Sequence, residues 1–352
     1  DSLVGGKNGH LGIIGNTLGL KIPPGFAITS RCFDVLVRQG KQSAEFDAIL
    51  RRWQAGDLTT EDASSRLQTL IVSLEIPRKI RREIERAVAR RVSGLPSRPT
   101  VFFAMRSSAV GEDSEHSYAG QFESVLNVRA RDVPEAYKRV LASLYSPRAM
   151  EYRRTRQIRE SEAIMAVGCQ VMIPAQISGV IYTLDVFNLE QDNLLVSSLF
   201  GLGANLVGGE QQADTFRMSR KPPHEIHSMK IVHKREILEQ DTEKSGLVTT
   251  PLDPLLQDSP SLKMEHLREL AQVGMQLERF FKHPQDIEFA YDRQGRLVIL
   301  QSRQLNIQQS KPNMTCDLSS LEDEFSVLMN KEGQIVQEGV AMGKVYQIES
   351  ED

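Results

Sequence analysis

The sequence predicts a protein of the α+β class, because helical and strand periodicities occupy separate stretches of the chain. Between Arg31 and Ser93 apolar residues recur three and four positions apart, which is typical of successive amphipathic helices. Beyond Pro99 the spacing changes to the alternation of β-strands. Two alternating runs then flank a turn within residues 285–304 and predict a β-hairpin.

The composition limits the classes of function that the chain can have. Its 352 residues and 40% hydrophobic content are sufficient for two or three domains with buried cores. Lys+Arg 43 and Asp+Glu 46 leave a formal charge of -3, which disfavours nucleic acid or a membrane surface as a partner. The three cysteines form no CxxC pair, so we expect neither a disulfide framework nor a structural zinc site, and we predict a cytoplasmic location. The chain begins without a methionine, and we expect it to be a piece of a longer protein.

The predicted elements follow one another along the chain. Residues 3–30 predict a loop, a helix, a proline-glycine turn and a strand. Further strands are predicted at Val101–Met105, Phe122–Val128, Ala166–Ile173, Gly179–Leu184 and Leu194–Leu199. Further helices are predicted at Val133–Leu144, Pro147–Arg156 and Pro260–Phe281. The polar stretch 306–321 predicts a linker, and residues 322–352 predict the first strands of another domain that is cut off.

A basic run, "RKIRREIERAVARR", lies within the helical region. Its apolar residues fall at helical spacing, and Glu83 and Glu85 interrupt the positive charge. We therefore interpret it as the solvated face of a helix and not as a nucleic-acid site.

The hairpin within "QDIEFAYDRQGRLVILQSRQ" carries the strongest chemical signal. With a loop at Asp292–Gly295, Tyr291 pairs with Arg296 and Asp286 faces Gln301. In that register the polar residues Asp286, Glu288, Gln301 and Arg303 share one surface of the sheet. The opposite surface takes the apolar residues Ile287, Phe289, Tyr291, Val298 and Leu300, and forms a core face.

This set of polar side chains fits a polyphosphate bound with a metal. Carboxylate and amide oxygens are ligands for Mg²⁺, and an arginine fork suits a terminal phosphate. The hairpin alone fits equally well an exposed sheet face with an ordinary ladder of salt bridges. The choice between the two depends on other parts of the chain.

A second candidate lies in "VFFAMRSSAVGEDSEHSYAGQ", where Arg106 ends an apolar strand before a loop of small and polar residues. Hydroxyl and backbone N–H groups of such a loop can donate to phosphate oxygens. Other phosphate and catalytic motifs are missing. "GGKNG" is not a P-loop, "GLGANLVGG" lacks the dinucleotide spacing, and the sequence contains neither HExxH nor GxSxG.

The segments together resemble the nucleotide-binding module of the phosphoenolpyruvate synthase and pyruvate phosphate dikinase family. The resemblance rests on "VGGKNGHLG", "IPPGFAITS", "MRSSAVGEDSEHSYAGQFESVLNV", "CQVMIPAQISGVIYT", "GLGANLVGGEQQADTF" and "QDIEFA" with "LVILQSRQ", and spans about residues 3–305. It implies an ATP-grasp fold over residues 1–305, in which two lobes, about 1–190 and 191–305, hold ATP between their sheets. The final segment, 322–352, resembles the start of the family's swivelling phosphohistidine domain.

The resemblance also implies roles for individual residues. Lys7, Arg106 and Arg303 would be catalytic groups on the phosphates. Ser117, Gly120 and Gln121 would belong to a loop that covers them, and Gln170, Val171 and Met172 would face the adenine. Glu288 and Gln301 would hold Mg²⁺, with Asp286 supporting them in the nucleotide site.

The function that the resemblance implies is that of a phosphoenolpyruvate synthase. ATP would be cleaved to AMP, and its β- and γ-phosphates would pass to a histidine on a downstream domain, which serves a pyruvate-binding domain. The family signature of that histidine is absent from this sequence. The pyruvate phosphate dikinase and rifampin phosphotransferase branches stay open as alternatives, as does a non-catalytic nucleotide-binding regulatory module. The resemblance also allows a homodimer.

Overall fold

The computed structural model describes residues 3–93, 101–109, 122–189, 191–207 and 212–305, apart from the side chains of 205 and 207. The chain divides into two units, Asp1–Asn306 and Ile307–Asp352, and every described residue belongs to the first. The predicted linker and the predicted cut-off domain lie outside the described residues. Helices and antiparallel strand pairs make up the described part, as the α+β prediction requires.

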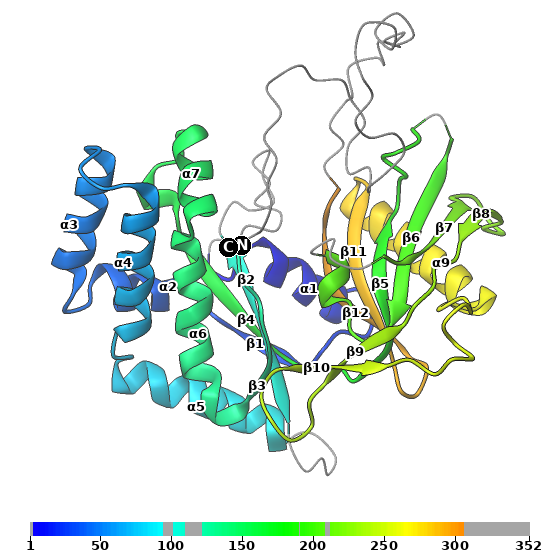
Figure 1. Cartoon of the computed structure of the whole chain (residues 1–352), viewed down its shortest axis with the longest axis horizontal. Coiled ribbons are helices and arrows are strands. Elements are labelled where there is room, and N and C mark those ends of the chain that lie inside the picture. The colour runs from blue at the N-terminus through cyan, green and yellow to red at the C-terminus, as the bar shows by residue number, and fades with distance from the viewer. Residues whose placement is uncertain (1–2, 94–100, 110–121, 190, 208–211, 306–352) are drawn as a thin grey trace, which may run out of the picture. The chain divides into compact units, whose positions relative to one another are not determined.

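The first sheet has four antiparallel strands in the order β1-β4-β2-β3. The strands are β1 (Gly25–Ile28), β2 (Phe102–Ala109), β3 (Val125–Arg129) and β4 (Met165–Val171). Helices gather on one of its faces (Figure 1), and they are α2 (Ser30–Phe33), α3 (Ser43–Gln54), α4 (Thr60–Ser73), α5 (Arg78–Ser93), α6 (Val133–Ala142) and α7 (Pro147–Thr155). Phe103 and Met105 of β2 point into the core that these helices form with the sheet. Burial of such apolar side chains is the main force that holds helices to a sheet.

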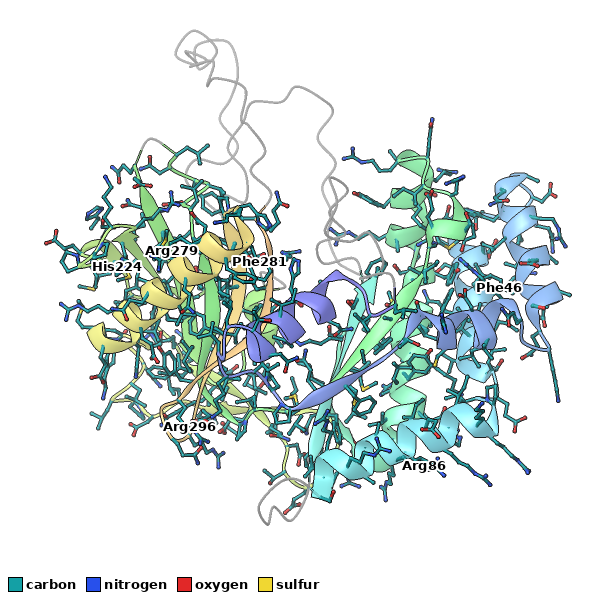
Figure 2. The ribbon with its side chains drawn as sticks, turned by 180° about the vertical axis from the view of Figure 1, so that it is seen from behind. Phe46, Arg86, His224, Arg279, Phe281 and Arg296 are labelled. Carbon is teal, nitrogen blue, oxygen red and sulfur yellow. The ribbon has the colours of Figure 1, made fainter. Side chains whose placement is uncertain are left out.

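The basic run lies in α5, where Ile84 and Val88 are buried and most of the other residues are at least partly exposed. Arg86 pairs with Glu83 at 2.7 Å on the helix surface and points away from the core (Figure 2). This exposure confirms the prediction of a solvated helix face.

The second sheet has six antiparallel strands in the order β12-β11-β5-β6-β7-β8. They are β5 (Ala175–Tyr182), β6 (Asn193–Phe200), β7 (Asp214–Ser219), β8 (Ile226–Lys230), β11 (Gln285–Asp292) and β12 (Leu297–Gln304). Two helices, α1 (Gly6–Asn16) and α9 (Met264–Phe281), pack on one face of this sheet, as Figure 2 shows from behind. Leu11 and Ile14 of α1 share a core there with Leu267 of α9 and Phe289 of β11.

The border between the two sheets differs from the predicted lobe border at residue 190. β5 lies before that border in the sequence but pairs with β6 and β11 of the second sheet. The N-terminal helix α1 also packs into the second core. The sheets therefore separate between β4 and β5. Hydrophobic alternation locates strands in a sequence, but it carries no information about which sheet each strand joins.

A third, two-stranded ribbon was not predicted. It consists of β9 (Glu236–Gln240) and β10 (Leu247–Pro251), and a short helix, α8 (Ala204–Val207), precedes it. The alternation of "EILEQ" and "LVTTP" is weak, because these strands bury few side chains. The strands β7 and β8 were missed as well. None of the helices in the described part of the chain has the length and hydrophobicity of a membrane-spanning segment.

The hairpin of β11 and β12 has a different register from the predicted one. Asp292 donates its backbone N–H to the carbonyl oxygen of Arg296 at 3.1 Å, and Gly295 takes a left-handed φ of 71°. Tyr291 consequently pairs with Leu297, one residue beyond the predicted partner Arg296. This shift and a bulge further along the hairpin together move the pairing at the site by two residues, so Asp286 faces Arg303 and Glu288 faces Gln301. The bulge leaves Leu300 without an opposite residue, so Ile299 faces Phe289 in the second core where Val298 and Leu300 were predicted.

Candidate functional site

The face of the first sheet opposite the helices carries a line of site residues on β2. Side chains alternate along a strand, so Phe102, Ala104 and Arg106 share this face. On the neighbouring strand β4, Gln170 lies opposite Ala104 and Gly168 lies opposite Arg106. β2 continues to Ala109, so Arg106 lies inside the strand and not at its end as predicted.

One end of this line is apolar and forms a pocket of about 360 Å³. Phe102 and Met172 pack there against Leu202, in a small cluster apart from the two main cores. The complete lining comprises Val101, Phe102, Val171, Met172, Pro174, Ala175, Leu202, Glu239, Gln240, Thr242, Arg293 and Gln294. A mainly apolar pocket with a few polar groups at one side is typical of sites for small organic ligands.

The three predicted adenine-facing residues take different places at this pocket. Met172 is buried and contributes to the lining. Val171 also lines the pocket, but its side chain belongs to the helical core of the first sheet, opposite Phe103. Gln170 is 7% exposed and lies on the site face beyond the lining residues.

The other end of the line is charged and joins the two sheets. The Arg106 Nη1 atom of β2 donates to Glu288 Oε2 of β11 at 2.6 Å. The side chains are only 18% and 16% exposed, so the pair is largely withdrawn from water. Because the two residues are 182 positions apart, this contact depends entirely on the tertiary fold.

Beside this pair, Arg303 donates to Asp286 Oδ2 through Nη2 at 2.6 Å and through Nε at 2.8 Å. All four predicted polar residues of the hairpin therefore share one face, although their pairing differs from the predicted one. The positive charge of Lys7 on α1 acts on both Asp286 and Glu288, as a smaller effect than burial and the arginine paired with each carboxylate.

The two carboxyl groups respond differently to burial. Burial raises the pKa of Glu288, but the charge and hydrogen bond of Arg106, with Lys7 and Arg303, outweigh it and hold the pKa below its ordinary value. For Asp286 burial is the stronger effect, and its pKa is raised in spite of Arg303. Burial, followed by the nearby Asp286 carboxylate, raises the pKa of Tyr182 to about 12.

Helix α1 carries Lys7 to this face and contacts both sheets. Asn8 donates its backbone N–H to Ser108 Oγ of β2 at 3.2 Å, while His10 Nδ1 lies 3.3 Å from the carbonyl oxygen of Ser302 on β12. Gly5, which precedes the helix, has a φ of 74° and lies so close to Ser108 that an added Cβ would overlap its carbonyl. Gly5 of "VGGKNG" thus allows the close approach of the helix to β2.

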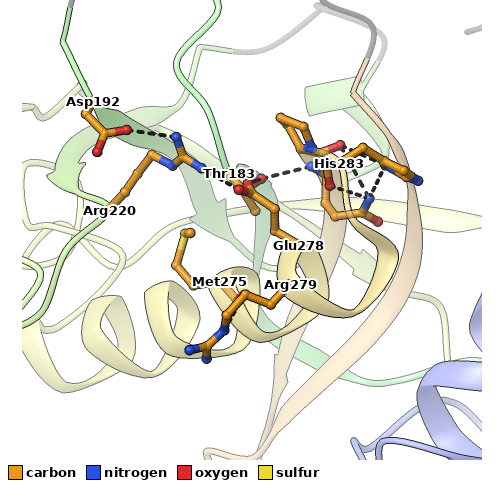
Figure 3. A network of polar contacts seen from close by, with 9 residues as sticks. Thr183, Asp192, Arg220, Met275, Glu278, Arg279 and His283 are labelled. Carbon is orange, nitrogen blue, oxygen red and sulfur yellow. Dashed lines mark hydrogen bonds and ion pairs between the residues drawn. The ribbon is translucent and has the colours of Figure 1, made fainter.

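A polar network positions the start of β11 next to Asp286 (Figure 3). Thr183 accepts the backbone N–H of Gln285 at 2.8 Å and donates its own N–H to the Gln285 carbonyl at 3.0 Å. Glu278 of α9 accepts hydrogen bonds from Thr183 Oγ1 and Arg220, and Arg220 also pairs with Asp192 at 2.7 Å. The network therefore ties α9 and the start of β11 to Thr183, the residue that follows β5.

Some site residues were missed by sequence reasoning, and others lie outside the described residues. Tyr182, opposite Asp286 on β5, was missed, although its alternation with Val180 in "GVIYT" is a local signal. The residues Glu239, Gln240 and Thr242 of the unpredicted ribbon had no such signal. Ser117, Gly120 and Gln121 lie outside the described residues.

The donor set also limits the kind of metal site. Within the described ranges, no group of three or more His, Cys, Asp or Glu residues could hold a metal. The charged face offers two carboxylates and the amide of Gln301. Mg²⁺ is commonly bound by one or two carboxylates together with water and substrate phosphates, so this donor set fits a magnesium ion that a phosphate ligand completes.

An apolar pocket followed by a face of arginine, lysine and carboxylate groups is characteristic of proteins that bind a nucleotide and its phosphates. The family comparison agrees with this class. Residues 1–320 match the family "Pyruvate phosphate dikinase, AMP/ATP-binding domain", and the chain belongs to this family.

Curated proteins of known name are similar to the chain over most of its length. Phosphoenolpyruvate synthase of Aeropyrum pernix is 32% identical over 331 residues, which cover 86% of this chain and 40% of that protein. Phosphoenolpyruvate synthase of Deinococcus radiodurans is 31% identical, with 99% of this chain and 45% of that protein covered. Rifampicin phosphotransferase of Bacillus subtilis is 30% identical, with 86% and 34% covered. The chain thus spans less than half the length of each of these relatives.

Proposed function

We propose that the chain binds Mg·ATP across the face between its two sheets and serves as the phosphotransfer module of a phosphoenolpyruvate synthase-like enzyme. The base would occupy the apolar pocket at Phe102 and Met172. Lys7, Arg106 and Arg303 would contact the phosphates. Glu288 and Gln301 would hold Mg²⁺, with Asp286 in support.

The arrangement of β2 is the observation that carries this proposal. Phe102 in the pocket wall and Arg106 on the charged face are four residues apart on the same side of one strand. At roughly 3.3 Å per residue, they are about 13 Å apart along the strand. This separation suits a ligand with an apolar base at one end and a chain of phosphates at the other. A nucleoside triphosphate has this form.

We assign the fold to the ATP-grasp class on the same grounds. Two antiparallel sheets contribute opposite sides of the site, β2 and β4 from the first and β11 and β12 from the second. The family match to an AMP/ATP-binding domain supports the assignment.

The proposed reaction needs positioning more than covalent chemistry from this module. A histidine nitrogen on a downstream domain would attack the β-phosphorus of ATP, the bond to the bridging oxygen of the α-phosphate would break, and AMP would leave. Arg106, Lys7 and Arg303 can stabilise the negative charge on the phosphates during this step. Bound Mg²⁺ would supply further neutralisation of that charge.

Calorimetric titration of the chain with Mg·ATP tests the site. We expect the wild type to bind, and Glu288→Gln to bind at least about tenfold more weakly because it removes a metal-directed carboxylate. Glu83→Gln, on the exposed surface of α5, is the matched control and should bind like the wild type. Equal binding by wild type and Glu288→Gln, or no binding by the wild type, would contradict the site assignment.

The identity of the final phosphate acceptor needs a separate experiment. The similarity to the rifampicin phosphotransferase of Bacillus subtilis extends over 86% of this chain, so ATP binding by itself does not select the acceptor. The full protein should form AMP with pyruvate as the acceptor, and rifampicin should have no effect. AMP formation that depends on rifampicin would instead favour the antibiotic phosphotransferase branch.

A further inference from the structure

The ribbon of β9 and β10 forms one wall of the apolar pocket, but it lies outside both sheets. A two-stranded ribbon by itself is only marginally stable in water. The middle of β9 is attached through Leu238, whose carbonyl accepts the backbone N–H of Leu202 at 2.8 Å. One end of the ribbon is the tip loop, which we define as residues 241–246, and it needs its own attachment if Gln240 and Thr242 are to stay at the pocket.

Most of that attachment is made by the side chain of Asn127 on β3, and Arg129 adds a contact with the Glu243 carbonyl. The Asn127 Nδ2 atom donates to the carbonyl oxygens of Asp241 at 2.8 Å, of Lys244 at 3.1 Å and of Gly246. Gly246 in turn donates its backbone N–H to the Asn127 carbonyl at 3.3 Å. The side chain of Asn127 is completely buried. The two N–H groups of the amide are shared among these three carbonyl oxygens, whereas a carboxylate at this place would put acceptors against acceptors.

The backbone of β3 is shaped to direct Asn127 at the tip loop. The register between β2 and β3 shifts between Phe103 and Met105, so that two residues, Leu126 and Asn127, lie opposite the single residue Ala104. Asn127 has a φ of 56°, a left-handed conformation that asparagine tolerates better than most residues. Bulges of this kind commonly redirect a side chain next to a functional site.

We propose that Asn127 is a positioning residue for the nucleotide base, which holds the tip loop and thereby the ribbon wall of the pocket. The inference rests on the proposed binding of ATP at this site. Asn127 does not contribute to the pocket lining and lies on a different strand from the charged residues Arg106 and Glu288. Loss of the hydrogen bonds between Asn127 and the tip loop should therefore weaken binding of the base and leave binding of the phosphates intact.

Two ligands separate these effects, because Mg·ATP needs both ends of the site and Mg·tripolyphosphate needs only the charged end. Asn127→Asp preserves the shape of the side chain but places carboxylate oxygens, which cannot donate, against the three carbonyl oxygens. Asn127→Gly preserves the left-handed backbone but lacks the amide. We expect both variants to bind Mg·ATP at least about tenfold more weakly, as expected for one or two lost hydrogen bonds, and to bind Mg·tripolyphosphate within about twofold of wild type. Gln54→Glu, on the exposed surface of α3, controls for the added charge.

A milder variant covers the case in which Asn127 variants do not fold. Arg129→Met removes the contact of Arg129 with the Glu243 carbonyl in the same tip loop, and with it a positive charge near Asp241. It should weaken Mg·ATP binding by about threefold and leave tripolyphosphate binding unchanged. Variants that bind Mg·ATP like the wild type, or that lose both ligands to the same extent, would overturn the inference. A wild type that binds neither ligand would instead refute the proposed function, on which this inference depends.

Discussion

At the scale of single residues, the site pairs a positive side chain with a negative one. The proposed ligand, Mg·ATP, likewise combines negative phosphates with a positive metal ion. Arg106, which we propose contacts phosphate, is paired with Glu288, which we propose binds the metal. Burying an unpaired charge is costly, and the pairing offsets that cost while the ligand is absent. Binding of Mg·ATP would replace this internal pair by an arginine–phosphate contact and a carboxylate–metal contact.

The same pair gives a prediction for the variant Arg106→Met. Burial alone would raise the pKa of Glu288, and Arg106 is the strongest of the groups that lower it. We expect the pKa of Glu288 to rise in the variant, which carbon NMR of glutamate-labelled protein can follow. Arg86→Met, which removes the partner of the exposed Glu83, should leave the pKa of Glu288 unchanged. An unchanged value in Arg106→Met would show that another group sets this pKa.

At the scale of elements, the turn of the β11–β12 hairpin and the bulge at Leu300 together determine how the site residues are paired. Asp292 Oδ1 accepts the backbone N–H groups of Gln294 and Arg296 at 3.0 Å each. Its Oδ2 atom accepts from Lys21 Nζ and Arg296 Nε, both at 2.9 Å. Burial raises the pKa of Asp292, but these hydrogen bonds outweigh it and lower the pKa to about 2.

The turn gives a prediction for Asp292→Asn. The folded-state pKa of Asp292 lies below its ordinary value of 3.8, so its stabilisation is fully present above that value and is lost as the pH falls toward 2. We expect the variant to be less stable by about 2 kcal/mol at pH 7, and by roughly half as much at pH 3. Urea unfolding at the two pH values measures this difference. Asp47→Asn, on the exposed surface of α3, is the control, and a pH-independent difference for Asp292→Asn would contradict the assignment.

At the scale of the whole described unit, two separate cores share one site. The first core joins the helices to β1–β4, and the second joins α1 and α9 to the six-stranded sheet. Helix α1 contacts Ser108 in the first sheet and Ser302 in the second, and the Arg106–Glu288 pair connects them again. A ligand bound at this face would contact both sheets at once.

Hydrogen exchange can test that shared site. At a hundredfold excess of ligand over Kd, binding stabilises the folded state by about 2.7 kcal/mol. We expect Mg·ATP to slow exchange of backbone amides in both β2 and β11, since the ligand must leave before either sheet can open at the site. Amides of α3, far from the site in the first core, serve as the internal reference. Protection confined to one sheet would contradict a site built from two.

The sequence by itself determined the elements with strong periodicity and the family. The helices from α3 to α7, the strands β2, β4 and β6, and the face that unites Asp286 with Glu288 all follow from local alternation. The roles of all the site residues stay predictions, both those on the described strands and those of the loop residues outside the described part.

Only the tertiary structure decided how these pieces meet. It placed β5 and α1 with the second sheet, inserted the bulge at Leu300, and brought Arg106 within 2.6 Å of Glu288. It also showed the ribbon of β9 and β10 and the contacts of its tip loop with Asn127. The sequence did not predict this ribbon because its strands are polar and alternate only weakly. The physical reason is that periodicity reports whether a residue faces a core, whereas strand pairing and bulges depend on contacts between residues far apart in the chain.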